Sequence, residues 1–189
     1  MGLRIFVVDN GGQWTHREWR VLRYLKVETK IIPNTTPLED LDVDGLVLSG
    51  GAPRISGEGI PMGNSASYVH KGTFPMLGIC LGCQFIALEL GGKAVSATTA
   101  EFGKTECVID TPDKLLAGLP PRFTVWESHN DEITHLPPEL ELLAHSENCA
   151  VQAFAHRTRP LFGTQFHPEV EHTEHGREIF ENFIRVCRS

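Results

Sequence analysis

The sequence lacks a long apolar run, a basic cluster and a paired set of cysteines. No stretch of its 189 residues approaches the roughly 20 consecutive apolar residues that a membrane span needs. It has no run of Lys or Arg and a formal net charge of -7, which disfavours nucleic-acid binding because phosphate contacts need a basic face. We therefore expect neither a membrane nor a nucleic acid as a partner.

The cysteines and the first residues of the chain bear on its compartment. Five scattered cysteines, an odd number, do not indicate a disulfide framework. The opening MGLRIFVVD predicts a strand that ends in Asp9 rather than a secretory signal. A reducing cytoplasm is the simplest location for such a chain.

Apolar runs separated by helical patterns predict the fold of the first half. Four short runs indicate buried strands, at residues 4–9, 27–33, 45–49 and 76–79. Strands that are apolar throughout are typical of a parallel sheet covered on both faces. Thr36 and Pro37 predict the start of a helix between the second and third runs. Residues 52–72, rich in Gly, Ser and Pro, predict a surface loop that borders a site.

After Gly92 the runs become shorter and more polar, which predicts a mixed or antiparallel sheet. The expected strands are residues 93–95, 105–110, 122–126, 140–145, 150–155 and 160–166, the last two forming a hairpin. A helix with one apolar face is expected over residues 174–186. The sequence thus predicts one α/β domain, residues 1–189, in which an open, mostly parallel sheet with helices on both faces is joined by a smaller mixed or antiparallel sheet.

Residues 75–92, PMLGICLGCQFIALELGG, predict a buried strand, a tight turn and a buried helix closed by glycine. Cys80 lies in the turn, with Gly78 and Gly82 on either side. Small neighbours let a side chain project from a cramped backbone, as at the nucleophile elbow of hydrolases. The amides that open the helix favour a thiolate there, so Cys80 is a candidate nucleophile.

Two other interpretations of Cys80 stay open on this stretch alone. A buried cysteine often acts only as a small hydrophobic residue. Cys80 and Cys83 also form a CxxC pair, which occurs in redox proteins and metal sites. No second ligand pair at short spacing accompanies the CxxC, so no metal site is expected.

The stretch Phe166-His167-Pro168-Glu169 offers a base for the cysteine. A catalytic cysteine needs an imidazole base and a group that holds the imidazole in one tautomer. His167 and Glu169, two residues apart on an extended segment stiffened by Pro168, are able to meet side by side. In isolation this stretch would be an ordinary surface turn, but together with Cys80 it predicts a Cys-His-Glu triad.

Gly50 and Gly51 follow the third strand and allow the backbone to approach a ligand closely. We interpret the Gly51 N–H and the Leu81 N–H as an oxyanion hole, the alternative being a plain turn. Ser49-Gly50-Gly51 also resembles the start of the SGGxDS phosphate loop of ATP pyrophosphatases. Pro53 and Arg54 stand where Asp and Ser would be needed, so a phosphate loop is not expected.

SGG, GICLGCQ and FHPE, in that order, resemble a class I (triad-type) glutamine amidotransferase domain with a flavodoxin-like fold. The resemblance covers nearly the full chain. Further stretches, VWESHND, EFG and PEVEHT, are similar to the amidotransferase part of GMP synthetases, which in the archaeal arrangement is a separate subunit. Cys83 and Asn130 depart from the commonest pattern of that family, which has Met or His and Gly at these positions.

The resemblance implies a role for each matching position. Cys80 attacks the side-chain amide of glutamine, His167 transfers the proton and Glu169 orients His167. Gln84 contacts the substrate glutamine. The backbone of Ser128, His129 and Asn130 faces its α-amino and carboxylate end.

The resemblance also implies a partner. The glutaminase would form a heterodimer with an ATP-pyrophosphatase subunit that uses ATP and Mg to convert XMP to GMP with the ammonia released. This chain itself would hold no cofactor. Alternatives are the amidotransferase component of anthranilate or aminodeoxychorismate synthase, a stand-alone γ-glutamyl hydrolase and a catalytically retired binding subunit.

Overall fold

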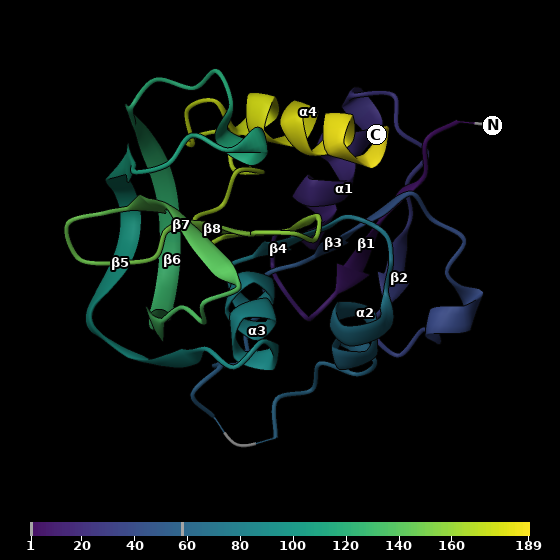
Figure 1. Ribbon diagram of the computed structural model, residues 1–189, viewed down its shortest axis with the longest axis horizontal. Helices are drawn as coiled ribbons and strands as arrows, with labels where there is room; N and C mark the ends of the chain where they lie inside the picture. The colour runs from purple at the N-terminus through teal and green to yellow at the C-terminus, as the bar shows by residue number, and fades with distance from the viewer. Residues whose placement is uncertain (1, 58) are drawn as a thin grey trace.

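A nine-stranded sheet forms the centre of the computed structural model, which describes residues 2–57 and 59–189 (Figure 1). The strands are β1 (Ile5–Asp9), β2 (Ile31–Pro33), β3 (Gly45–Leu48), β4 (Met76–Ile79), β5 (Lys93–Ile109), β6 (Arg122–His135), β7 (Leu140–His145), β8 (Ala153–His156) and β9 (Leu161–Thr164). The helices are α1 (Thr15–Tyr24), α2 (Ser65–Lys71), α3 (Leu81–Glu89) and α4 (Gly176–Cys187), with short 3-10 turns η1 (Leu38–Asp40) and η2 (Lys114–Leu116). Within the described residues, none of these helices combines the length and the apolar character needed to cross a membrane.

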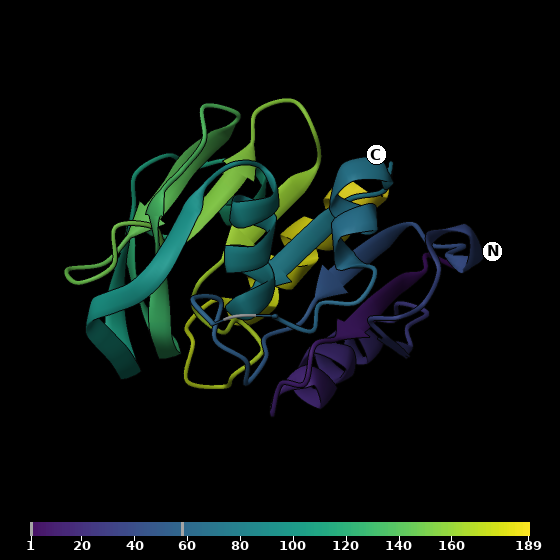
Figure 2. The same cartoon turned by 90° about the horizontal axis from the view of Figure 1, so that it is seen from below.

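The sheet runs in the order β2-β1-β3-β4-β9-β8-β7-β5-β6. The first five strands are parallel, and each pair from β9 to β6 is antiparallel. β9 belongs to both parts, because it pairs in parallel with β4 and forms the expected antiparallel hairpin with β8. The predicted α/β class is confirmed, and its two sheet parts are continuous. Figures 1 and 2 show the antiparallel strands at one end of the molecule and β2 toward the other.

Alternate residues of the buried strands face two separate cores. Val7 on β1 packs with α1 and α4, whereas its neighbour Val8 packs with α2 and α3. This two-residue alternation is what a strand covered on both faces requires. Figure 1 shows the two helix pairs on opposite sides of the parallel strands. As a result, the loops at the carboxyl ends of β1, β3 and β4 remain uncovered at one edge, where ligands bind in such sheets.

Three expectations about local structure were wrong. Thr36 does not cap a helix, because its hydroxyl donates to the Pro33 carbonyl (2.7 Å) and only η1 follows. The expected loop 52–72 contains α2. The expected short strands 93–95 and 105–110 fall on one long strand, β5, which ends at Ile109, and residues 122–126 are only the start of the long strand β6. The second half of β6 was missed because its buried positions alternate regularly but include the polar Glu127, His129 and Asp131, which hide the apolar pattern.

Candidate active site

Cys80 stands at the junction of β4 and α3 in a backbone conformation that is rare for a side-chain-bearing residue, with φ 50° and ψ -106°. Its N–H donates to the Thr164 carbonyl on β9 (2.8 Å), which ties the junction to the sheet. The turn requires glycine at position 82, because a Cβ there would lie 2.2 Å from the Leu48 carbonyl oxygen of β3. The predicted nucleophile elbow is therefore present in the fold.

The Cys80 thiol lines a cavity of about 440 Å³ at the carboxyl edge of the sheet. Only 7% of Cys80 is exposed. Its Sγ accepts a contact from the Gln165 side-chain amide (3.6 Å) and lies 3.9 Å from the Ser128 carbonyl. The cavity has the size of a small-molecule site, and Cys80 Sγ lies at its wall.

His167 and Glu169 meet in the same cavity, as the FHPE stretch predicted. His167 Nδ1 lies 2.7 Å from Glu169 Oε1, and both side chains are buried. Trp14, just before α1, packs edge-on against the imidazole with ring centroids 4.5 Å apart. His167 Nε2 is buried and has no hydrogen-bond partner among the described residues. Glu169 and Trp14 thus fix the ring while leaving its second nitrogen available for proton transfer.

A hydroxyl braces the segment that carries this pair. The Thr173 hydroxyl donates to the His167 carbonyl (2.7 Å) and accepts from the Trp126 N–H of β6 (2.9 Å). The His167 N–H also donates to the Trp126 carbonyl (3.0 Å). The turn is therefore fastened to β6 at two points and braced internally by the third bond.

The charges around His167 favour its protonated form. Burial alone would lower the pKa of His167, but the Glu169 carboxylate and the Cys80 sulfur outweigh burial and raise it well above its usual value. Glu18 on α1 is a second buried carboxyl of this cavity. Burial, and then the charge of Glu169, raise the pKa of Glu18 well above the usual range, which favours its neutral form.

Gly51 and Leu81, whose N–H groups the sequence predicts as oxyanion donors, line the same cavity as Cys80. Gly50 sits against the catalytic pair, since a Cβ there would be 3.3 Å from His167 Cε1 and 3.6 Å from Cys80 Cβ. At Gly51 a Cβ would lie 2.4 Å from Leu81 Cδ2 and 2.5 Å from the Asn10 carbonyl oxygen. Gly51 and Leu81 are therefore in contact distance across the cavity wall, and both line it next to Cys80.

Gln84 lines the cavity but is neither solvated nor wholly free for a substrate. Its side-chain nitrogen donates to the Asp131 carbonyl (2.7 Å) and to Gln165 Oε1 (2.9 Å). Gln84 therefore holds α3 to β6 at the site. Any contact with a ligand would fall to the amide oxygen.

Ser128, His129 and Asn130 all border the cavity, but in different ways. Ser128 presents its carbonyl to Cys80. The His129 ring is buried in a polar cluster behind the cavity. Asn130 is exposed and has no positive φ, so this position does not need the glycine of the commonest family pattern.

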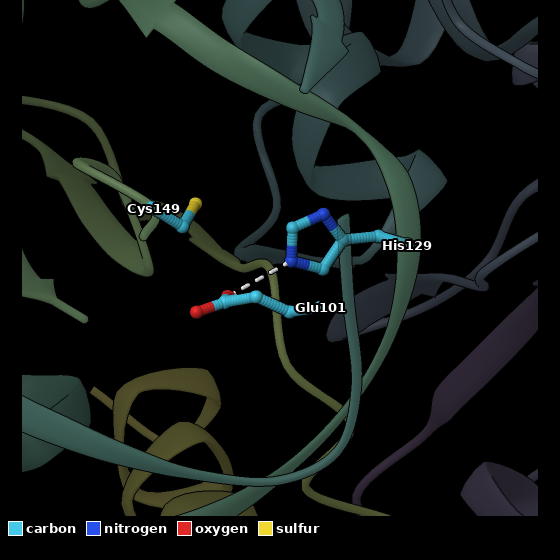
Figure 3. Close-up of side chains that lie close together, drawn as sticks. All are labelled: Glu101, His129 and Cys149. Carbon is cyan, nitrogen blue, oxygen red and sulfur yellow. Dashed lines mark hydrogen bonds and ion pairs between the residues drawn. The ribbon is translucent and has the colours of Figure 1, made fainter. Parts of the chain in front are cut away.

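The polar cluster behind the cavity contains Glu101, His129 and Cys149, whose potential ligand atoms lie within 4.8 Å of one another (Figure 3). Figure 3 shows the Glu101 carboxyl joined to the His129 ring, with Cys149 approaching from another segment. Glu101 also accepts from Ser146 (2.7 Å) and Gln152 (2.8 Å). Burial raises the pKa of Cys149, which keeps the thiol protonated. The bonds of Glu101 tie β5 to His129 of β6 and to the segment that carries Ser146 and Gln152.

Cys83, the second cysteine of the CxxC pair, lies in the core. It is fully buried, and its Sγ would be 2.7 Å from a Cβ added at Gly163. Burial, followed by the nearby Cys80, raises the pKa of the Cys83 thiol well above its usual value. Both cysteines are free. Cys83 thus packs α3 onto β9, as a small hydrophobic residue would.

Asp131 is a functional candidate that the sequence interpretation took for a turn residue and did not place among the site residues. Its carboxylate accepts hydrogen bonds from Arg54 and from both the N–H and the hydroxyl of Ser56. Arg54 and Ser56 belong to the loop that begins at Gly51. The acidic residue of the SHND stretch was the available signal, but its partners become visible only when β6 is placed beside that loop.

Comparisons with known proteins agree with this geometry. The family model "Glutamine amidotransferase class-I" matches residues 6–187. A Thermoplasma acidophilum protein, named as one subunit of a glutamine-hydrolyzing GMP synthase, is 56% identical over 188 residues, which are 99% of this chain and 94% of that protein. A solved structure from the same organism has a TM-score of 0.95 at 55% identity and covers 100% of this chain and 95% of its own. A glutamine amidotransferase structure from Thermotoga maritima, 21% identical, shares the fold with a TM-score of 0.76, covering 100% of this chain and 83% of its own.

Proposed function

The chain belongs to the class I glutamine amidotransferases, and on that basis we propose that it is the glutamine-hydrolysing subunit of a two-chain GMP synthase. The observation that carries the proposal is the placement of Cys80 beside the bonded His167–Glu169 pair in one cavity. The synthase assignment is supported by relatives that share about half of its residues and are named as one subunit of that enzyme.

The first half-reaction transfers the glutamyl group to sulfur. Cys80 Sγ attacks the side-chain amide carbon of glutamine while His167 holds the thiol proton. The N–H groups of Gly51 and Leu81 stabilise the negative oxygen of the tetrahedral adduct. As the C–N bond breaks, His167 gives its proton to the nitrogen, and ammonia leaves behind a glutamyl thioester.

The second half-reaction restores the thiol. His167 Nε2 takes a proton from a water molecule, whose oxygen attacks the thioester carbonyl carbon. The C–S bond then breaks, glutamate leaves, and the proton returns to sulfur. Glutamine and water have become glutamate and ammonia, and Glu169 has held the imidazole in one tautomer throughout.

The ammonia requires a consumer that this chain does not provide. Its sequence has no GxxxxGK[ST] phosphate loop, and Pro53 and Arg54 replace the Asp and Ser of an SGGxDS loop. We therefore assign ATP, Mg and the activation of XMP to an ATP-pyrophosphatase subunit that forms a heterodimer with this chain. The five free cysteines suit a reducing cytoplasm.

Reconstitution tests the proposed function. The purified chain is mixed with an ATP-pyrophosphatase synthetase, XMP, MgATP and glutamine, and both GMP and glutamate are measured. We expect the two products in equal amounts, and no glutamine-dependent GMP when this chain is omitted. If glutamate forms without GMP, at a rate that the synthetase does not change, the synthase assignment is contradicted and a stand-alone hydrolase is favoured.

A further inference from the structure

Three carboxyl side chains line the active-site cavity, yet its proposed substrate carries an α-carboxylate. Glu18, Asp131 and Glu169 line the cavity, and Arg54 is the one Lys or Arg side chain that lines it among the residues described. A carboxylate that enters this site loses hydration and meets the charged Asp131 carboxylate, so it needs a cationic partner. From the sequence, only the backbone of residues 128–130 was predicted to face this end of the substrate.

Arg54 is held in place from one side. Its Nε donates to Asp131 (3.0 Å), and its Nη2 donates to Asp131 and to Ser96 of β5 (2.8 Å). Burial would raise the pKa of Asp131, but the bonds from Arg54 and Ser56 lower it, so the carboxylate stays charged. The Arg54 Nη1 group donates no hydrogen bond within the described residues, and half of the Arg54 side chain is exposed.

We propose that Arg54 binds the α-carboxylate of the substrate glutamine and that Asp131 is the positioning residue that holds the guanidinium toward the cavity. The inference rests on the proposed function, because it takes glutamine as the substrate. A guanidinium that is already held by a buried carboxylate still has N–H groups for a second carboxylate. Because its side chain is already ordered, binding costs it little further conformational entropy.

This assignment couples substrate binding to the oxyanion loop. Arg54 lies three residues after Gly51, and Ser56 fastens the same loop to Asp131 through its N–H (3.1 Å) and hydroxyl (2.9 Å). A substrate carboxylate on Arg54 would therefore contact the loop that supplies an oxyanion donor. Ligands with a side-chain amide but no α-carboxylate would lack this contact.

A binding experiment tests the assignment without turnover. In a Cys80→Ala background, glutamine and glutamine α-amide, whose carboxylate is replaced by a neutral carboxamide, are titrated by calorimetry. With Arg54 intact we expect glutamine to bind about tenfold or more tightly than the α-amide, the scale of a hydrogen bond to a charged group. Arg54→Met should weaken the binding of glutamine by about that factor and leave the affinity for the α-amide nearly unchanged.

Two further variants separate charge recognition from loop structure. Arg54→Lys should retain part of the preference for glutamine, because it keeps the positive charge. Arg122→Met, which removes an exposed arginine paired with Glu106, should retain all of it. An unchanged preference in Arg54→Met, or an equal loss for both ligands, would overturn the assignment. Failure of the Cys80→Ala protein with Arg54 intact to bind glutamine at all would overturn the proposed substrate as well.

Discussion

At Cys80 a single residue combines backbone strain with chemistry. A side-chain-bearing residue at φ 50° costs about 1–3 kcal/mol, and such strain persists only where the surroundings hold it. Here the sheet holds it, through the bond from the Cys80 N–H to Thr164, and the close approach of Gly82 to Leu48 leaves the turn no room to relax. The strain sets the sulfur at the cavity wall, beside the imidazole that takes its proton.

The raised pKa of His167 predicts how stability depends on pH. The unfolded chain has a histidine pKa of about 6.5, and the folded protein holds the proton more tightly. Folding therefore binds protons above about pH 6.5, so the stability that protonated His167 contributes is lost as pH rises through its folded-state pKa. In urea unfolding, the stability of wild type relative to His167→Gln should fall with rising pH in this range.

Glu169→Gln serves as the comparison, because it removes the carboxylate that raises the pKa of His167. In the Glu169→Gln background, the change in unfolding free energy caused by His167→Gln should depend less on pH. If the unfolding free energy of wild type relative to His167→Gln stays constant, or increases, as pH rises above about 6.5, the assigned charge state is contradicted.

The residues of the site differ in how far sequence alone could find them. Cys80 and His167 sit in short stretches whose local pattern already implies a strand end or a turn. Glu18 and Asp131 could not be found in this way, because their roles depend on which elements meet at the cavity. Gln84 was predicted as a substrate contact and lines the cavity, but its bonds to Asp131 and Gln165 depend on tertiary packing that the sequence does not reveal.

Among the secondary-structure elements, the apolar pattern predicted the strands that are buried on both faces. It failed for the strand whose buried side chains are polar. The strands around residues 45–49 and 76–79 lie within one residue of their expected ends, because every position in them is buried. β6 was predicted only to residue 126, since the buried positions that follow carry Glu127, His129 and Asp131. These are the residues that brace the site, so the pattern failed where function replaces apolar packing.

The contact of α3 with β3 predicts a strong effect of a single methyl group. Gly82→Ala would place Cβ 2.2 Å from the Leu48 carbonyl oxygen, so α3 must move away from the sheet. We expect a loss of about 1–3 kcal/mol in unfolding free energy, the usual cost of overpacking, and a loss of glutaminase activity because the elbow moves with the helix. Gly2→Ala, where no atom lies within 4 Å of the added Cβ, is the matched control. Equal stability of the two variants would refute the tight packing.

For the molecule as a whole, the rim of the cavity carries an exposed apolar side chain. Phe102, 61% exposed, lines the cavity together with the half-exposed Arg54. A partner that packs on this rim would contact the loop that carries Gly51. Because a misplaced oxyanion donor costs on the order of 10²- to 10³-fold in rate, small shifts of this loop matter.

We therefore predict that the isolated chain is a poor glutaminase. Addition of the synthetase with XMP and MgATP should raise its kcat/KM for glutamine by roughly tenfold or more. The measurement is glutamate release with and without the partner. Full turnover by the chain alone, unchanged when the partner is added, would show that the loop is already in its productive position.

The central claim is that Cys80 produces ammonia for use by another subunit, and one variant tests it most directly. Cys80→Ala is reconstituted with the synthetase, and GMP formation is measured with glutamine and, separately, with ammonium salt as the nitrogen source. We expect the glutamine-dependent rate to disappear while the ammonium-dependent rate remains that of wild type. Loss of both rates, or survival of the glutamine-dependent rate, would contradict it.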